Sequence, residues 1–212
     1  MKRDYYKTPL DHKINQIGIT IVPTLWQKNF SSNDLAGFFS DFNCQQLVIK
    51  PRISANADNT LWIKKEFAEH FSSQLAAAFS QSEFMVQPFM SKVIDEGEFS
   101  LFYFDGQYSH AILKTPKADD FRVQEEHGGR LQAITPEKAL LAQADDTLAA
   151  ITKLTGEMPL YARVDFVRCS DEYACDEFAL MEAELIEPSL YFNMDDNAAE
   201  RFAKAFVNRM GG

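Results

Sequence analysis

Two stretches of the chain decide its fold: Tyr161-Ala162-Arg163-Val164-Asp165-Phe166-Val167-Arg168 and Ala179-Leu180-Met181-Glu182-Ala183-Glu184-Leu185-Ile186-Glu187-Pro188. Alternate residues of a β-strand face the same way, so Arg163 and Asp165 share one face of the first stretch. Glu182 and Glu184 share one face of the second stretch for the same reason. We expect the two to pair as an antiparallel hairpin that turns near residues 172–174, which puts Asp165 opposite Glu182.

The hairpin therefore predicts a cluster of carboxylates, with Asp165, Glu182 and Glu184 on one patch of a sheet. Like charges placed directly opposite one another repel, so the cluster needs a counter-charge. Hard oxygen ligands suit Mg²⁺, which takes one or two carboxylates together with substrate phosphates and water. The alternative is a solvated acidic face in which Arg163 is the internal counter-ion. Apolar residues flank the acids within residues 179–188, which indicates a strand buried on one face and favours the metal site.

Outward from this hairpin, periodicity and turn residues predict an α+β arrangement of two lobes. Residues 1–83 alternate helix and strand: helices over 8–18, 32–42 and 66–80 and short strands over 19–22, 46–50 and 61–63. Residues 84–212 are mainly antiparallel strands covered by helices, with strands over 84–90, 100–104, 107–114, 121–124, 160–168 and 177–186. Asp105-Gly106 between two apolar runs is a strong hairpin signal. Helices are expected over 135–155 and 197–210.

Three basic residues are opposite in charge to the acid cluster and are candidates for binding a phosphate group. Lys50 ends a buried apolar strand just before a loop of small residues, and such loops let backbone N–H groups approach phosphates. Lys114 ends another strand, and Arg122 follows it. Taken singly, each of the three is more often a surface charge. The run 86–89 offers backbone hydrogen-bonding groups to an adenine edge or is simply an edge strand that ends at proline.

Composition excludes some classes of protein. The chain has 212 residues, 31 acidic and 21 basic side chains and a net charge of −10, so it lacks the basic footprint of a nucleic-acid-binding protein. No apolar run reaches the roughly 20 residues of a membrane helix, and the N-terminus lacks the apolar core of a signal peptide. Three cysteines in no metal-binding pattern fit a reducing cytoplasm. Cys169 and Cys175 could face each other across a hairpin and form a disulfide or a metal site, and are otherwise read as plain thiols.

Five segments together resemble the ATP-grasp superfamily nearly from end to end. The segments are Val48-Ile49-Lys50-Pro51-Arg52-Ile53-Ser54-Ala55, Met85-Val86-Gln87-Pro88-Phe89-Met90, Glu96-Gly97-Glu98-Phe99-Ser100, Asp120-Phe121-Arg122-Val123-Gln124 with His127-Gly128-Gly129, and the hairpin of residues 161–188. Within the superfamily they are most similar to the glutathione-synthetase-like ATP-binding domains, the subgroup of the D-cycloserine cyclo-ligases and of the enzymes that add glutamate to a ribosomal protein. The resemblance implies an ATP-grasp fold, with residues 1–83 as the small lobe, residues 84–212 as the large lobe and nucleotide between them.

The resemblance also implies which residues bind the nucleotide. Lys50 would hold the phosphates, and Lys2 would do so too. Gln87 and Phe89 would frame the adenine, and Glu98 would take the ribose.

The remaining roles concern the reaction. Lys114 and Arg122 would face the transferring phosphoryl group, and Arg163 would bind the substrate carboxylate or neutralise the acids. The three carboxylates of the hairpin would ligate one or two Mg²⁺ or Mn²⁺ ions. The implied reaction transfers the γ-phosphoryl group of ATP to a carboxylate, and an amine then attacks the acyl-phosphate. The protein contributes positioning and charge neutralisation to such a reaction.

The chain also departs from the family. Relatives carry a further α/β domain before this region, so we expect that this N-terminal domain is lacking, which favours a homodimer through the face it leaves open. The phosphate loop has Asn56 where a glycine is expected. The leading hypothesis is a carboxylate–amine ligase acting on small-molecule substrates, with neither nucleic acid nor membrane as a partner. The alternatives are a nucleotide-binding module without ligase activity and a structural protein without a nucleotide site.

Overall fold

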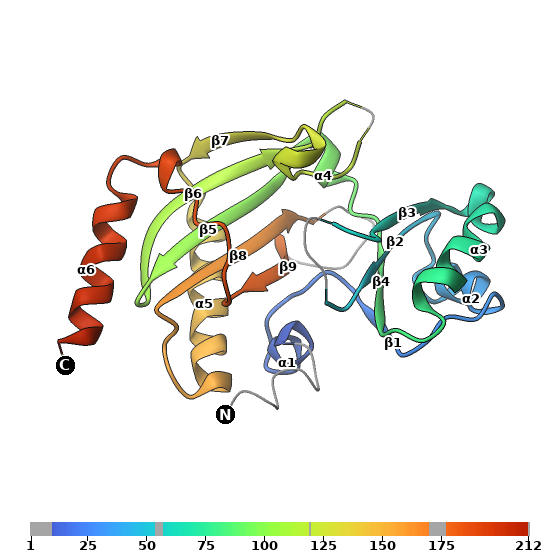
Figure 1. Ribbon diagram of the computed structural model, residues 1–212, viewed down its shortest axis with the longest axis horizontal. Coiled ribbons are helices and arrows are strands. Elements are labelled where there is room, and N and C mark those ends of the chain that lie inside the picture. The colour runs from blue at the N-terminus through green and yellow to red at the C-terminus, as the bar shows by residue number, and fades with distance from the viewer. Residues whose placement is uncertain (1–9, 54–56, 119, 170–176, 212) are drawn as a thin grey trace. The chain divides into compact units, whose positions relative to one another are not determined.

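A computed structural model describes residues 10–53, 57–118, 120–169 and 177–211, with side chains from residue 13 onward (Figure 1). These residues form two compact units. One unit is Val22–Ser91, and the other combines the described residues up to Ile21 with those from Lys92 onward.

The division differs from the expected boundary at residue 83, for two reasons. Strand β4 (Phe84–Pro88) pairs with both β1 (Leu25–Gln27) and β2 (Gln46–Pro51), which ties it to the smaller unit. Helix α1 (Leu10–Gln16) instead packs against elements of the larger unit. An isolated bridge between Ile21 and Leu180 also joins the start of the chain to the larger unit.

The unit Val22–Ser91 is a four-stranded sheet in the order β1-β4-β2-β3, with β3 at Leu61–Lys64. Helices α2 (Asp34–Asp41) and α3 (Ala68–Phe79), the latter preceded by the short helix η1 (Lys65–Phe67), pack on one face of this sheet. Their apolar residues meet Leu47, Ile49 and Val86 in one buried core. Because side chains alternate along a strand, Lys50 and Gln87 lie on the opposite face.

The larger unit is a five-stranded antiparallel sheet in the order β7-β6-β5-β8-β9. Its strands are β5 (Glu98–Phe104), β6 (Gln107–Thr115), β7 (Arg130–Ile134), β8 (Tyr161–Arg168) and β9 (Phe178–Glu184). Helix α5 (Lys138–Thr155) packs on one face, where Leu140, Ala144, Leu148 and Ile151 contact the strands, and α1 joins the same core. The other helices are α4 (Lys92–Asp95), η2 (Glu125–His127), η3 (Phe192–Met194) and α6 (Ala198–Met210).

Most of the expected elements are present, and the Asp105-Gly106 link is a two-residue turn with φ values of 47° and 79°. The short strand predicted over residues 121–124 is wrong. There, Asp120 accepts hydrogen bonds from the backbone N–H groups of Phe121 and Arg122 at 2.8 and 3.0 Å, so the chain forms a local turn instead of a strand. The sheet is extended by β7, which the sequence analysis did not include.

Two findings bear on the environment of the protein. Cys169 is disulfide-bonded, so the expectation of a free thiol at this position is wrong. Cys44 is a free, buried cysteine. Among the described helices, none combines the length and apolar character that a membrane span requires.

Candidate functional site

The acidic hairpin is formed by β8 and β9. Asp165 pairs with Glu182 and Arg163 pairs with Glu184, so the predicted register is confirmed. The register then shifts, and Phe166 pairs with Leu180. This bulge leaves Met181 as an extra residue in β9, which lets Leu180 face the apolar core while Glu182 stays on the opposite face of the sheet.

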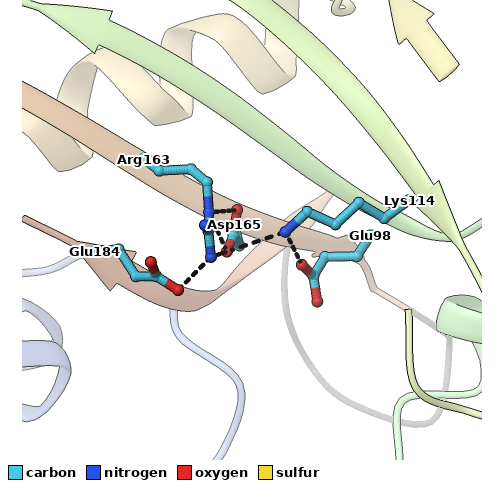
Figure 2. Close-up of polar contacts among 5 residues, drawn as sticks. All are labelled: Glu98, Lys114, Arg163, Asp165 and Glu184. Atoms are coloured by element: carbon cyan, nitrogen blue, oxygen red, sulfur yellow. Dashed lines mark hydrogen bonds and ion pairs between the residues drawn. The ribbon is translucent and has the colours of Figure 1, made fainter. Parts of the chain in front are cut away.

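A network of ion pairs connects this hairpin with two central strands (Figure 2). Lys114 of β6 donates a hydrogen bond of 2.9 Å to Glu98 of β5, and its Nζ lies 3.6 Å from Oδ2 of Asp165. Arg163 donates from Nε to both carboxylate oxygens of Asp165, at 3.1 and 3.0 Å, and also pairs with Glu184. Asp165 is only 1% exposed, so its charge is balanced almost entirely by Lys114 and Arg163.

Burial and neighbouring charges divide the carboxylates of this network into two kinds. Burial on its own would raise the pKa of Asp165, but Arg163 and Lys114 outweigh it and hold this pKa below its ordinary value. For Glu184, burial and the neighbouring charges of Glu182 and Asp165 prevail over Arg163, and the pKa rises to about 7. Burial, together with Asp165, likewise raises the pKa of Glu98 despite the pairing with Lys114. The site therefore has a shortage of positive charge, which an added cation would relieve.

The three candidate metal ligands lie close together. Oxygen atoms of Asp165, Glu182 and Glu184 all lie within 4.8 Å of one another. Carboxylate oxygens at this spacing fit a hard divalent cation such as Mg²⁺. Arg163 contacts two of the three carboxylates, those of Asp165 and Glu184. These contacts also agree with the alternative considered from the sequence, in which Arg163 is the internal counter-ion of the acids. A cation that bridged Asp165 and Glu184 would have to compete with this guanidinium group.

The other predicted residues of this unit lie in different surroundings. Lys114 and Glu98, expected to face phosphate and ribose, are paired with each other inside the network. Arg122 makes a two-pronged ion pair with Asp120, through Nε at 3.0 Å and Nη2 at 2.8 Å. Among the described residues, the ion pair of Arg122 joins it to Asp120 and not to the acid cluster.

The remaining predicted nucleotide-binding residues belong to the four-stranded unit. The side chain of Gln87 donates a hydrogen bond of 2.9 Å to the hydroxyl of Thr24. The ring of Phe89 stacks on Trp62, with centroids 4.5 Å apart and planes at 19°. Lys50 pairs in register with Met85 on the face opposite the helices. Lys2 lies outside the described residues.

Sequence reasoning missed Trp62, which together with Phe89 makes a flat apolar pair beside the face that carries Lys50. The available signal was a tryptophan in the short alternating strand at residues 61–63, one of only two tryptophans in the chain. The Gly128-Gly129 pair, which is part of the family resemblance, also has a structural explanation. A Cβ atom at Gly129 would lie 2.0 Å from the carbonyl oxygen of Val123, so this glycine is required by close backbone packing.

The chain is similar to several known proteins, although no family model matches it. The cycloserine biosynthesis protein DcsG of Streptomyces lavendulae is 30% identical over 202 residues, which are 91% of this chain and 66% of that protein. The crystal structure of D-cycloserine synthetase DcsG superposes with a TM-score of 0.81 at 27% identity, covering 94% of this chain and 68% of that one.

More distant structures share the fold. D-alanine–D-alanine ligase from Bacillus anthracis has a TM-score of 0.64 at 15% identity, covering 93% of this chain and 64% of that one. The ligase PsnB has a TM-score of 0.63 at 15% identity, covering 94% and 58%. The chain thus spans just under two thirds of the curated relative that it matches.

Proposed function

Because this chain has the ATP-grasp fold, we propose that it is an ATP- and Mg²⁺-dependent carboxylate–amine ligase, or the catalytic ATP-binding part of one. A single observation carries the proposal. Three carboxylates from two neighbouring strands gather on one sheet face, beside the buried cations Lys114 and Arg163. Such a mixed cluster is costly to bury, and it fits a site that handles both metal and phosphate.

In this proposal Asp165, Glu182 and Glu184 hold one or two divalent ions, Mg²⁺ or Mn²⁺. When bound, the metal supplies charge neutralisation for the phosphoryl oxygens. Arg163 and Lys114 keep Asp165 ionised and offer positive charge to the oxygens of the transferred group. Arg122, which forms an ion pair with Asp120, is assigned to the same phosphoryl group.

The nucleotide base and phosphates are assigned to the four-stranded unit. Lys50, together with Lys2, would contact the phosphates. Gln87 and Phe89 would frame the adenine, and the flat pair of Phe89 with Trp62 offers an aromatic surface for it. Glu98 is assigned to the ribose, although its pairing with Lys114 also gives it a part in fixing that lysine.

The proposed reaction joins two small-molecule substrates. The carboxylate of one attacks the γ-phosphorus of ATP and releases ADP. The amine of the other then attacks the acyl-phosphate and releases inorganic phosphate with an amide bond. One structural neighbour is a D-alanine–D-alanine ligase, so amino acids are the first candidates. A cytoplasmic location stays a prediction. The disulfide at Cys169 removes one argument for it, because that argument took the cysteines to be thiols in a reducing compartment.

The test is release of ADP from Mg²⁺-ATP in the presence of a panel of amino acids and related amines. The proposal expects ADP in amounts that depend on both a carboxylate and an amine. If protein that binds Mg²⁺-ATP releases no ADP with any pair of carboxylate and amine, the result would count against the ligase function.

A second candidate is a nucleotide-binding module without ligase activity. It is favoured by the ion pairs of Arg163 with Asp165 and Glu184, which occupy two of the three candidate metal ligands. Mg²⁺-ATP would then raise the melting temperature without any turnover, since a ligand that binds the folded state stabilises it.

A further inference from the structure

Tyr191 lies in the segment between β9 and α6, on the sheet face that carries the acid cluster. Its ring packs edge-on against Phe102 of β5, with ring centroids 6.1 Å apart. Phe102 pairs in register with Arg163 of β8, and side chains paired across antiparallel strands share one face of the sheet. Tyr191 is therefore a neighbour of the Arg163 end of the ion-pair network.

The backbone of Tyr191 is held in an unusual conformation. Its φ and ψ are both 45°, in the left-handed region that bulky residues rarely occupy. His110 of β6 fixes the preceding residue, because its Nε2 lies 3.1 Å from the carbonyl oxygen of Leu190 and its ring stacks on Phe102. A strained residue persists only where its surroundings hold it, and such residues are concentrated at functional sites.

The hydroxyl group of Tyr191 is available to a ligand. The side chain is half-buried, and none of the described residues forms a hydrogen bond with its hydroxyl. A phenol that is packed into a protein usually has a hydrogen-bond partner. Here the ring is fixed by Phe102 while the polar end has no partner among the described residues, an arrangement that suits contact with a bound molecule.

The charges around Tyr191 indicate the chemistry of that molecule. Burial raises the pKa of the phenol, so its hydroxyl stays protonated and acts as a donor at neutral pH. Lys114 and Arg163 oppose this rise, so both cations act on the phenol. Glu125 and Glu126 of η2 add to the rise. A donor beside two cations fits an anionic oxygen, and the two acids suit a positively charged group of the same molecule. An amino acid carries both.

Position along β5 indicates which anionic oxygen this is. Glu98 and Phe102 lie on the same face of the strand, about 13 Å apart along it. Asp165 lies between them, because it pairs with Ser100. In the proposed function the ribose is at Glu98 and the transferred phosphoryl group is at Asp165. The next group in line, on the side of Tyr191, is the carboxylate that accepts the phosphoryl group.

We propose that Tyr191 is a substrate-contacting residue, and that its hydroxyl donates a hydrogen bond to the carboxylate of an amino-acid substrate. The bond orients one carboxylate oxygen while the other attacks the γ-phosphorus of ATP and ADP leaves. This inference deepens the proposed function and rests on it for the order of nucleotide, metal and substrate along the sheet.

Isothermal titration of amino acids in the presence of Mg²⁺ and a non-hydrolysable ATP analogue tests the contact without turnover. The probes are the common L-amino acids and their D-enantiomers. At least one of them is expected to bind the wild-type chain. Tyr191→Phe should weaken its binding at least about tenfold, because the variant loses a hydrogen bond to a charged group. The ring and its contact with Phe102 remain, so the melting temperature should stay unchanged.

Tyr108→Phe is the matched control for this titration. Tyr108 is also half-buried, and its hydroxyl likewise forms no hydrogen bond with any described residue, but its ring packs against the core on the opposite face of the sheet. This variant should bind the amino acid as the wild type does. Failure of every amino acid to bind the wild type would overturn the proposal. Equal binding by the wild type and Tyr191→Phe would overturn it as well.

Release of ADP separates this proposal from the ligase function. Where the wild type releases ADP, Tyr191→Phe should raise KM for the amino acid at least about tenfold and leave KM for ATP unchanged. Release of ADP with an unchanged KM for the amino acid would remove the Tyr191 contact and leave the ligase function intact. Amino-acid binding that depends on Tyr191, without any release of ADP, would instead remove the ligase function and leave the contact.

Discussion

At the scale of single residues, Asp165 is the centre of the candidate site. It is almost fully buried and contacts both Lys114 and Arg163. The sequence pointed to this residue because the alternation of strand 161–168 puts it on one face with Arg163. The contact with Lys114 was not predictable, because it depends on the pairing of β5 with both β6 and β8, between segments some fifty residues apart.

Replacement of Asp165 by alanine should destabilise the larger unit strongly. Two buried cations would lose their shared carboxylate, and loss of one partner of a buried ion pair costs about 3–5 kcal/mol. Urea unfolding at pH 7 measures the change. Glu182→Gln removes an exposed carboxylate of the same cluster and should change the free energy of unfolding by less than about 0.5 kcal/mol. Equal losses for the two variants would show that the network does not depend on Asp165.

Gly97 is a residue that the fold requires for two reasons. Its φ is +114°, and a Cβ atom there would lie 2.6 Å from the carbonyl oxygen of Lys114, next to the site. Gly97→Ala should therefore cost about 2–4 kcal/mol, from backbone strain together with displacement of the β6 backbone. Gly156→Ala is the matched control, because its φ is +83° but no atom lies within 4 Å of the added Cβ. It should cost only about 1 kcal/mol, and a Gly97→Ala protein as stable as this control would contradict the close approach.

At the scale of elements, His110 fastens the segment before α6 to strand β6. Its ring stacks on Phe102 at 4.3 Å, and its Nε2 lies 3.1 Å from the carbonyl oxygen of Leu190. Burial holds the pKa of His110 below its ordinary value of 6.5, and Arg201 acts in the same direction, whereas the Leu190 carbonyl and Asp195 oppose them. The folded protein therefore keeps this ring neutral more readily than the unfolded chain does.

A depressed pKa gives a defined pH dependence. The contribution of His110 is fully present above pH 6.5 and is lost as the pH falls below it, because the unfolded state then takes up a proton that the folded state does not. Urea unfolding at pH 7.5 and pH 5.5 should show a larger loss for the wild type than for His110→Gln, whose amide still reaches the Leu190 carbonyl but does not titrate. Equal losses of unfolding free energy in the wild type and in His110→Gln would mean that other groups cause the pH dependence.

Elements defined by local signals were predicted well, and those defined by distant partners were not. The Asp105-Gly106 turn, the hairpin of β8 and β9 and helix α5 all follow from nearby residues. Strand β7 was missed because Arg130-Leu131-Gln132-Ala133-Ile134 is a short segment with no aromatic and one β-branched residue, and its strand conformation depends on pairing with β6. The compact unit Val22–Ser91 extends past the expected boundary at residue 83 because the strand partners of β4 lie in the preceding part of the chain.

At the scale of the whole molecule, the candidate residues are divided between two units. The acid cluster with Lys114, Arg163 and Glu98 lies in the larger unit, whereas Lys50, Gln87 and Phe89 belong to Val22–Ser91. A net charge of −10 makes local cations valuable for any polyphosphate ligand. ATP is therefore expected to bind far better with a divalent cation than without one.

Isothermal titration of Mg²⁺-ATP into the wild-type chain, Glu182→Gln and Glu177→Gln tests the central claim that the acid cluster holds the metal of ATP. Glu182 is an exposed member of the cluster, and Glu177 is an exposed acid of the same hairpin outside it, so both variants lose one negative charge. The account predicts that Glu182→Gln binds Mg²⁺-ATP at least about tenfold more weakly than the wild type, a loss of about 1.4 kcal/mol, while Glu177→Gln binds it equally well. Undiminished binding by Glu182→Gln would contradict the claim.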